Sequence, residues 1–181
     1  MKKLIAVLLG VMLLVSCGFA GEREYLERSC DCGETACVCF MQKGDFGTPV
    51  GLAIDVLKQT GYLDPKHSKT YDSEAETAVL KLQRDCGLPE TGVLDDDTLT
   101  FLLWGMNSEQ LDAEYASMPL KMVWVPTDGG KKYHNKKTCS QMYDPRKISQ
   151  RNAIALGIEP CGRCAKADKG ITYDSIIENN D

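Results

Sequence analysis

Apolar residues recur at helical spacing in three segments between residues 40 and 106. The first stripe stops before Gly61, and the second starts after Ser73, its expected N-cap, and stops at Gly87. Asp95 is the expected cap of the third. The apolar positions are Val50, Ile54 and Leu57, then Ala75, Val79, Leu82 and Cys86, and finally Leu99, Leu102 and Leu103. The pattern predicts a compact three-helix unit with Cys86 as a core thiol, at a size where one small core is only just sufficient.

The pattern changes after residue 120 to a strand, turns and one short helix. Val123–Pro126 predicts a strand, and Lys131–His134 is expected to return beside it as a hairpin partner. Ser149 is a suitable N-cap for a short helix that ends at Gly157.

Together these elements predict an α+β fold made of two small units. A three-helix domain is expected over residues 40–106 and a hairpin-plus-helix module over residues 121–167. Residues 107–120 are acidic with a weak helical pattern and are interpreted as a linker, and residues 168–181 as an acidic tail.

Residues 1–16 have the pattern of a signal peptide. Two lysines precede an apolar run that ends at Val15, which is short for a membrane span and typical of a signal core. The sequence Leu14-Val15-Ser16-Cys17 resembles the lipobox of bacterial lipoproteins. This resemblance implies an exported protein that is acylated on Cys17 and anchored to the cell membrane facing the wall, with residues 17–29 as a tether. Cleavage after Ala20 is the alternative and would give a secreted protein.

Composition and charge exclude several classes of protein. Of 181 residues, 43% are hydrophobic and 26% charged, which are ordinary values for a globular chain and argue against disorder or many membrane spans. The 26 acidic and 21 basic residues give a net charge of -5, so no nucleic-acid partner is expected unless the charges are strongly segregated. Nine cysteines in closely spaced groups indicate metal sites or disulfides.

The first cysteine group, over residues 30–39, has the palindromic pattern C-x-C, four residues, C-x-C. In a hairpin, residues two apart point to the same side, so Cys30, Cys32, Cys37 and Cys39 would project together. They could form the disulfides Cys30–Cys39 and Cys32–Cys37, or hold a second metal ion such as zinc. An oxidising compartment favours the disulfides.

The second group joins His134 and Cys139 to the later pair Cys161 and Cys164. Two close pairs from distant segments are typical of a structural Cys₃His zinc site, which a module with so small a core needs. The alternative is one disulfide between two of the three cysteines, with a surface histidine. Residues 153–164 resemble the zinc domain of Ada-type DNA-alkylation repair regulators. His134 replaces a cysteine of that family's first pair, so the resemblance implies the metal fold and not methyl transfer.

The helical unit carries a specific set of motifs in a specific order. They are Gly61-Tyr62-Leu63, Tyr71-Asp72, Thr77-Ala78-Val79, Leu82-Gln83, Gly87-Leu88 and Thr91-Gly92-Val93-Leu94-Asp95. The unit thereby resembles the peptidoglycan-binding-like domain of cell-wall hydrolases and spore proteins. The first helix departs from the family, with Ala53-Ile54 in place of Leu-Gln.

This resemblance implies that peptidoglycan is the partner of residues 40–106. Aromatic faces beside hydrogen-bonding groups suit glycan and peptide ligands, which makes Tyr62, Tyr71, Asp72 and Gln83 the candidate ligand residues. The alternative for each is structural, with the tyrosines as packing residues and Gln83 holding a loop. His67 is expected to be a solvated loop residue.

No catalytic residues are predicted. Catalytic zinc needs an open fourth position, whereas the second cysteine group offers four protein ligands. The sequence therefore predicts a non-catalytic, exported cell-envelope protein that binds peptidoglycan and carries structural zinc. The alternatives are an exported metal-binding or metal-sensing protein anchored at the wall, and an accessory part of a cell-wall hydrolase system.

Overall fold

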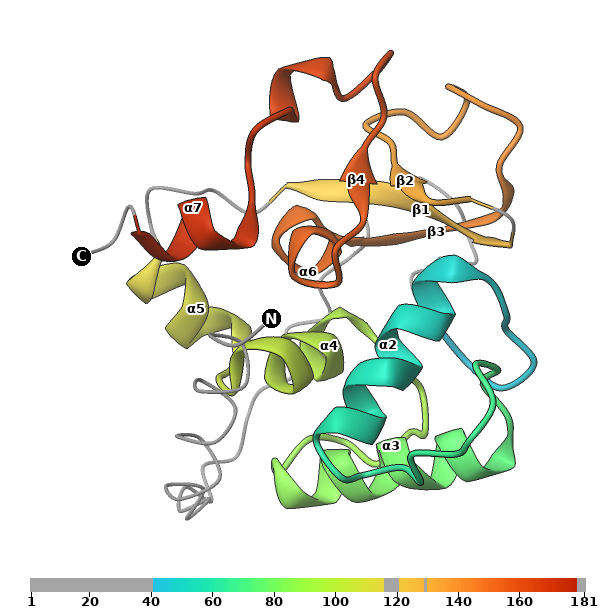
Figure 1. The fold of residues 1–181 in the computed structure, drawn as a ribbon. Helices are drawn as coiled ribbons and strands as arrows, with labels where there is room; N and C mark the ends of the chain where they lie inside the picture. Colours follow the sequence, from blue (N-terminus) through green and yellow to red (C-terminus); the bar gives the residue numbers. More distant parts are fainter. Residues whose placement is uncertain (1–40, 116–120, 129, 179–181) are drawn as a thin grey trace.

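The computed structural model describes residues 41–115, 121–128 and 130–178, which form helices and two small sheets (Figure 1). The elements are, in chain order, α2 (Thr48–Gln59), α3 (Ser73–Asp85), α4 (Asp96–Trp104), α5 (Ser108–Glu114), β1 (Met122–Asp128), β2 (Lys132–Tyr133), β3 (Tyr143–Ser149), α6 (Gln150–Ala155), β4 (Glu159–Pro160), the 3-10 turn η1 (Lys166–Asp168) and α7 (Tyr173–Glu178). None of the helices in these ranges is both long enough and apolar enough to cross a membrane. The predicted signal peptide, Cys17, the tether and the cysteine group of residues 30–39 lie outside the described residues.

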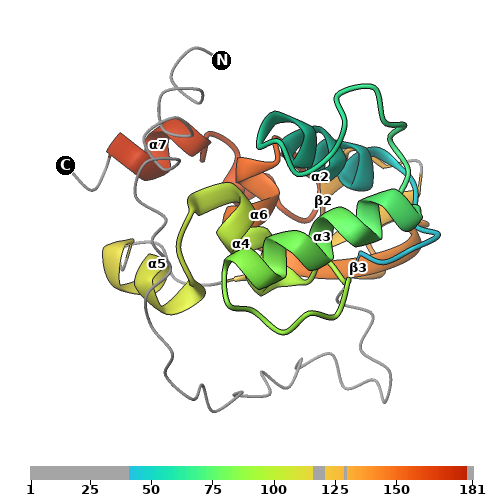
Figure 2. The same ribbon diagram turned by 90° about the horizontal axis from the view of Figure 1, so that it is seen from below.

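The three predicted helices are present as α2, α3 and α4, and α3 runs alongside α4 in Figure 2. Asp95 caps α4 as predicted, because its side chain accepts a 2.8 Å hydrogen bond from the backbone N–H of Thr98. The cap of α3 is Asp72, one residue before the predicted Ser73, and it accepts from the backbone N–H groups of the first turn. Cys86 is half-buried at the C-terminus of α3 rather than inside the helical core.

Met41, which precedes α2, lies inside the core rather than at its edge. Met41 is fully buried and forms an isolated antiparallel bridge with Leu94, the residue just before the cap of α4. Its backbone N–H donates to the Leu94 carbonyl at 3.3 Å and its carbonyl accepts from the Leu94 N–H at 2.9 Å.

The strands of the C-terminal part pair differently from the predicted hairpin. The long partner of β1 is β3, antiparallel, with Trp124 opposite Lys147 and Val125 opposite Arg146. The expected partner segment is bridged to β1 at Trp124 and His134, just after β2, whereas β2 itself pairs in parallel with β4. The sequence does not predict β3, because Pro145 and the charged residues beside it interrupt the apolar pattern of a strand. Proline and charged residues are nevertheless tolerated in edge strands.

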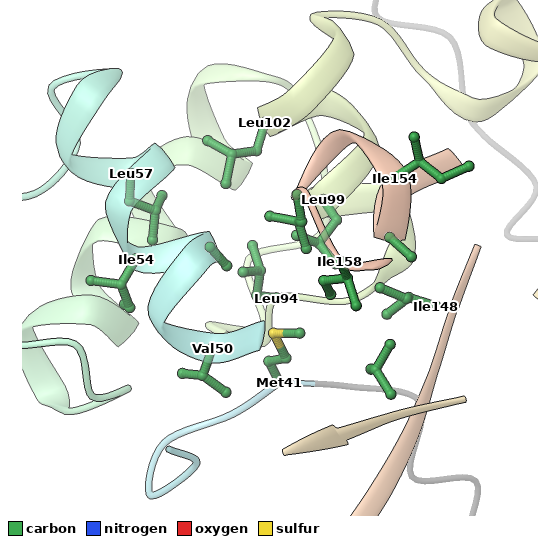
Figure 3. Packing of buried hydrophobic residues seen from close by; sticks show 14 of the residues in the cluster. Met41, Val50, Ile54, Leu57, Leu94, Leu99, Leu102, Ile148, Ile154 and Ile158 are labelled. Carbon is green, nitrogen blue, oxygen red and sulfur yellow. The ribbon is translucent and has the colours of Figure 1, made fainter. Parts of the chain in front are cut away.

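The two predicted units share one hydrophobic core. Figure 3 shows Ile54 of α2 and Leu99 of α4 in the same cluster as Ile148 of β3, with side chains of both units between them. Helix α6 contacts α4 on one side and both long strands on the other, so it fills the space between helices and sheet (Figure 1).

The predicted linker and tail also take part in packing. Within residues 107–120, Leu111 of α5 and Tyr115, the residue that ends this helix, lie in the core. Within residues 168–181, α7 buries Ile176, and the centroid of the Tyr173 ring lies 5.1 Å from that of Trp104, with the two rings tilted by 37°. Both segments therefore extend the hydrophobic contact between the two units.

A buried polar network crosses the boundary between the units at Asn152 of α6, which is completely buried. Its side-chain oxygen accepts from Trp104 Nε1 at 3.0 Å. Its side-chain nitrogen donates to Asp96 Oδ1 at 2.9 Å, to the Asp96 carbonyl at 3.0 Å and to Thr100 Oγ1 at 3.0 Å. Asp96 in turn accepts from the backbone N–H of Ser149 at 2.7 Å, so the network attaches α4 to the first turn of α6.

Candidate metal centre and ligand surface

Four ligand atoms from His134, Cys139, Cys161 and Cys164 lie within 4.8 Å of one another. Cys139 Sγ is 3.9 Å from Cys161 Sγ, and Cys164 Sγ is 3.6 Å from His134 Nδ1. A tetrahedral ion with metal–sulfur bonds of about 2.3 Å and a metal–nitrogen bond of about 2.05 Å requires edges of about 3.8 and 3.6 Å. A disulfide needs sulfur atoms about 2.05 Å apart, and the three cysteines are free. The predicted ligands are thus together, without a disulfide, and could hold a metal ion such as zinc.

Backbone hydrogen bonds place the ligands. His134 directly follows β2 and exchanges two 2.7 Å hydrogen bonds with Trp124 of β1. The Cys161 N–H donates to the Tyr133 carbonyl at 2.9 Å, so the turn that carries Cys161 and Cys164 is fixed against β2. The fold therefore brings the two ligand pairs together even though they are far apart in the chain.

The protonation preferences suit a cation between the sulfur atoms. Backbone N–H groups of Cys164 and Arg163 lower the pKa of the Cys161 thiol to about 7. The neighbouring Cys164 and Cys161 raise the pKa of Cys139 to about 11, since clustered thiols without a cation resist multiple ionisation. Burial and the charge of Arg163 lower the pKa of His134, which favours the neutral imidazole that binds metals.

A second layer of contacts holds the ligand loops. The Asn135 side chain donates to the Cys164 carbonyl at 3.0 Å and to Asp168 Oδ2 at 3.3 Å. Asp168 also pairs at 3.1 Å with Lys121, which precedes β1. The sequence does not predict these residues. Asn135 could be suspected only because it follows His134, and Asp168 belongs to no recognisable spacing pattern.

Two of the predicted ligand residues lie inside the helical unit. Gln83 is 1% exposed; its Nε2 donates to the Val93 carbonyl at 2.9 Å, and its Oε1 accepts from the backbone N–H groups of Thr91 and Gly92, both at 2.9 Å. Tyr71 is also buried, its hydroxyl donates to the Gly92 carbonyl at 2.8 Å, and burial raises its pKa. Both side chains hold the loop before α4.

The other two predicted ligand residues reach the surface. Asp72 caps α3, and its Oδ1 is 2.9 Å from Nε2 of His67. The side chain of His67 is only 3% exposed, so the predicted solvated position is wrong, and the ring fixes its loop to the cap. Tyr62 is half-buried, with Lys81 Nζ 5.7 Å from its ring centroid.

These surface residues line two shallow hollows that meet at Ser73. One is lined by Lys43, Gly44, Asp45, Phe46, Thr70, Tyr71, Asp72 and Ser73, and the other by Tyr62, Ser73, Glu74, Thr77, Ala78 and Lys81. Phe46 is 53% exposed, the more exposed of two large hydrophobic residues at the surface of the described chain. Its position between Gly44 and Gly47 could have indicated a protruding turn.

The comparisons with known proteins concern this helical unit. Residues 47–102 match the family model described as "Putative peptidoglycan binding domain". The match confirms the predicted peptidoglycan-binding-like domain over α2, α3 and most of α4. It does not reach the metal cluster or the N-terminus. A search of curated proteins gave no match, and neither did a search of solved structures.

Proposed function

We propose that this protein is a non-catalytic component of the cell envelope that binds peptidoglycan through its helical unit and carries structural zinc. The family match over residues 47–102 is the observation that carries the proposal. The predicted lipid anchor at Cys17 would hold the exported protein on the membrane, facing the wall.

The two hollows around Ser73 are the proposed ligand surface. Phe46 and Tyr62 offer aromatic faces on either side, which suits the apolar face of a sugar ring. Lys43 and Lys81 add positive charge that can pair with stem-peptide carboxylates. Asp72 and Ser73 provide hydrogen-bonding oxygens between them.

The metal cluster supports a structural role for zinc. His134, Cys139, Cys161 and Cys164 together fill a tetrahedral coordination shell, which leaves no position for a substrate or an activated water. When bound, zinc would supply a cross-link between β2, the following loop and the turn after β4. The arrangement therefore favours a binding protein over a metallohydrolase.

Sedimentation of the full chain with purified peptidoglycan sacculi tests the proposal. Wild-type protein should sediment with the sacculi, and Phe46→Ala or Tyr62→Ala should weaken retention about threefold to tenfold, as the loss of one stacking contact predicts. Met122→Ala removes another exposed hydrophobic side chain, far along the chain, and should leave retention unchanged. Equal retention of all three variants and the wild type would refute this ligand surface.

A second candidate function is metal binding or sensing at the wall, which the Cys₃His cluster supports. In that case metal removal and restoration should change a downstream interaction, while the full chain should not bind sacculi directly. Release of soluble muropeptides by the protein would instead support the accessory hydrolase role.

A further inference from the structure

Charge is strongly segregated along this chain. Residues 121–169 contain 11 lysines and arginines but only 4 acidic residues, a net charge of +7. The remainder contains 10 basic and 22 acidic residues, a net charge of -12. The overall net charge of -5 is thus the sum of a basic C-terminal module and an acidic remainder. Because the charges are segregated in this way, the basic module can attract polyanions although the whole protein is acidic.

Part of this basic charge is neutralised inside the fold. Arg146 pairs with Asp45 at 3.1 Å, and Arg151 pairs with Asp112. Other basic residues of the module have no carboxylate within ion-pair distance among the described residues; they are Lys131, Lys136, Lys147, Arg163, Lys166 and Lys169. Five of the six are exposed and Lys147 is half-exposed, so their charge is available to a partner.

Ring contacts place two lysines of the module on one face of the sheet. Lys147 and Lys137 extend their ammonium groups over the Trp124 ring, 5.0 and 5.1 Å from its centroid. On the other side of Trp124 lies His134, its bridge partner, which directly follows β2. The sheet thus carries a row that runs from Lys147 through Trp124 to His134.

The metal-ligand turn continues this row. Arg163 is exposed and lies between Cys161 and Cys164 in this turn, and the Lys169 side chain lies against Gly162. Zinc with three thiolates and a neutral imidazole carries a net charge of -1, which one cation balances. The module has more unpaired lysines and arginines than the single cation that would balance the zinc site.

We propose that this basic face binds a phosphodiester-linked anionic polymer of the cell envelope, with Trp124 and its two lysines at the centre. The proposal rests on the envelope location proposed above. A flexible polymer can follow the basic face and avoid the acidic remainder, whereas a flat anionic membrane would meet both. The Trp124 ring is covered by ammonium groups, so it is not offered for stacking as in single-stranded nucleic-acid sites.

Binding of the zinc-loaded full chain to poly(glycerol phosphate) of defined length tests the proposal. Affinity should fall steeply with salt, with a slope of roughly -0.7 for each phosphate neutralised in a single-stranded polyanion. The triple variant Lys137→Gln/Lys147→Gln/Lys169→Gln removes the lysines whose contacts place them on this face. It should bind roughly tenfold or more weakly at low salt, with a slope shallower by about 2. The control Lys66→Gln/Lys69→Gln/Arg84→Gln removes equal charge from the helical unit and should bind as the wild type does.

Equal affinity of the wild type and the basic-face variant would overturn the proposal. So would tighter binding to vesicles of equal parts phosphatidylglycerol and phosphatidylcholine, or to single-stranded DNA at equal phosphate concentration. Sacculi stripped of phosphate polymer separate this inference from the peptidoglycan proposal. If the protein binds peptidoglycan, the wild type and the basic-face variant should sediment equally with stripped sacculi. If neither protein sediments with stripped sacculi, while the free polymer binds the wild type and not the variant, the peptidoglycan proposal fails and this one stands.

Discussion

Replacement of Asn152 by alanine should destabilise the whole protein, because its carboxamide joins the two units. The variant leaves Trp104 Nε1 without its acceptor and removes one donor from the buried Asp96 carboxylate, which keeps the Ser149 N–H. Thr100 Oγ1 also loses a donor. The unsatisfied Trp104 N–H costs about 1–3 kcal/mol, and each of the hydrogen bonds lost by Asp96 and Thr100 about 1 kcal/mol, so we expect a total loss of about 3–5 kcal/mol. That is a large share of the roughly 5–15 kcal/mol by which a domain is stable.

Urea unfolding of the zinc-loaded full chain measures this loss. The two tryptophans report on different units, since Trp104 lies in α4 and Trp124 in β1. With a urea dependence near 2 kcal/mol/M, the midpoint should fall by about 2 M in one cooperative transition. Asn107→Ala, which removes only the cap of α5, is the matched control and should cost about 1 kcal/mol. A loss below about 1 kcal/mol for Asn152→Ala, or two separate transitions, would refute the shared-core reasoning.

Three further predictions follow from the caps, the metal cluster and the buried amide. Asp72→Ala should cost about 1 kcal/mol near neutral pH. The hydrogen bond from the Ala75 N–H, then those from His67 and Glu74, lower the pKa of Asp72. The stabilisation by the Asp72 carboxylate is therefore present above the unfolded pKa of about 4 and is lost as the pH falls through the lower folded value. The melting temperatures of the wild type and Asp72→Ala should therefore differ near neutral pH and converge in acid. Removal of zinc by a chelator should weaken hydrogen-exchange protection in α2 and α4 as well as in the strands, because the core is shared; unchanged protection in both helices would contradict this. Gln83→Ala should lower stability by about 2–4 kcal/mol by freeing the N–H of Gly92, without weakening sacculus binding by the folded fraction; a selective binding loss at full stability would instead make Gln83 a ligand residue.

The helices of the N-terminal unit were predictable because local signals suffice for them. Apolar stripes and a capping aspartate define α4, and the stripe of α3 is equally clear. The cap of α3 was placed one residue late because Asp72 and Ser73 are both good capping residues, and only the backbone conformation decides between them. Such adjacent alternatives are the ordinary limit of boundary prediction.

The metal ligands were predictable for a different reason. Histidine and cysteine at close spacing are rare enough that His134, Cys139, Cys161 and Cys164 stand out without any knowledge of the fold. Their support by Asn135 and Asp168 depends on tertiary contacts between a loop and a 3-10 turn, and no periodicity records such contacts.

The union of the two units was not predictable. Helix α6 carries Gln150, Arg151 and Asn152, which as a sequence read as polar and solvent-facing, yet all three are buried. The structure supplies partners from α4, α5 and β2, including Tyr133, whose hydroxyl accepts from Gln150 at 3.1 Å. Arg151 is satisfied only in part, because its Nε and Nη1 are buried without a hydrogen-bond partner among the described residues. Long-range satisfaction of polar groups is the information that the local pattern lacks.

The bridge between Met41 and Leu94 has a mechanical consequence. A pulling force that acts on the chain at Met41 acts inside the core and not at a helix end. The force first meets the two backbone hydrogen bonds to Leu94 and the buried Met41 side chain, and the cap of α4 follows directly after them. A protein attached at one end to a membrane and on one face to the wall would therefore yield first at this bridge, and the helical unit would open beside α4 while the metal cluster still held the C-terminal strands together.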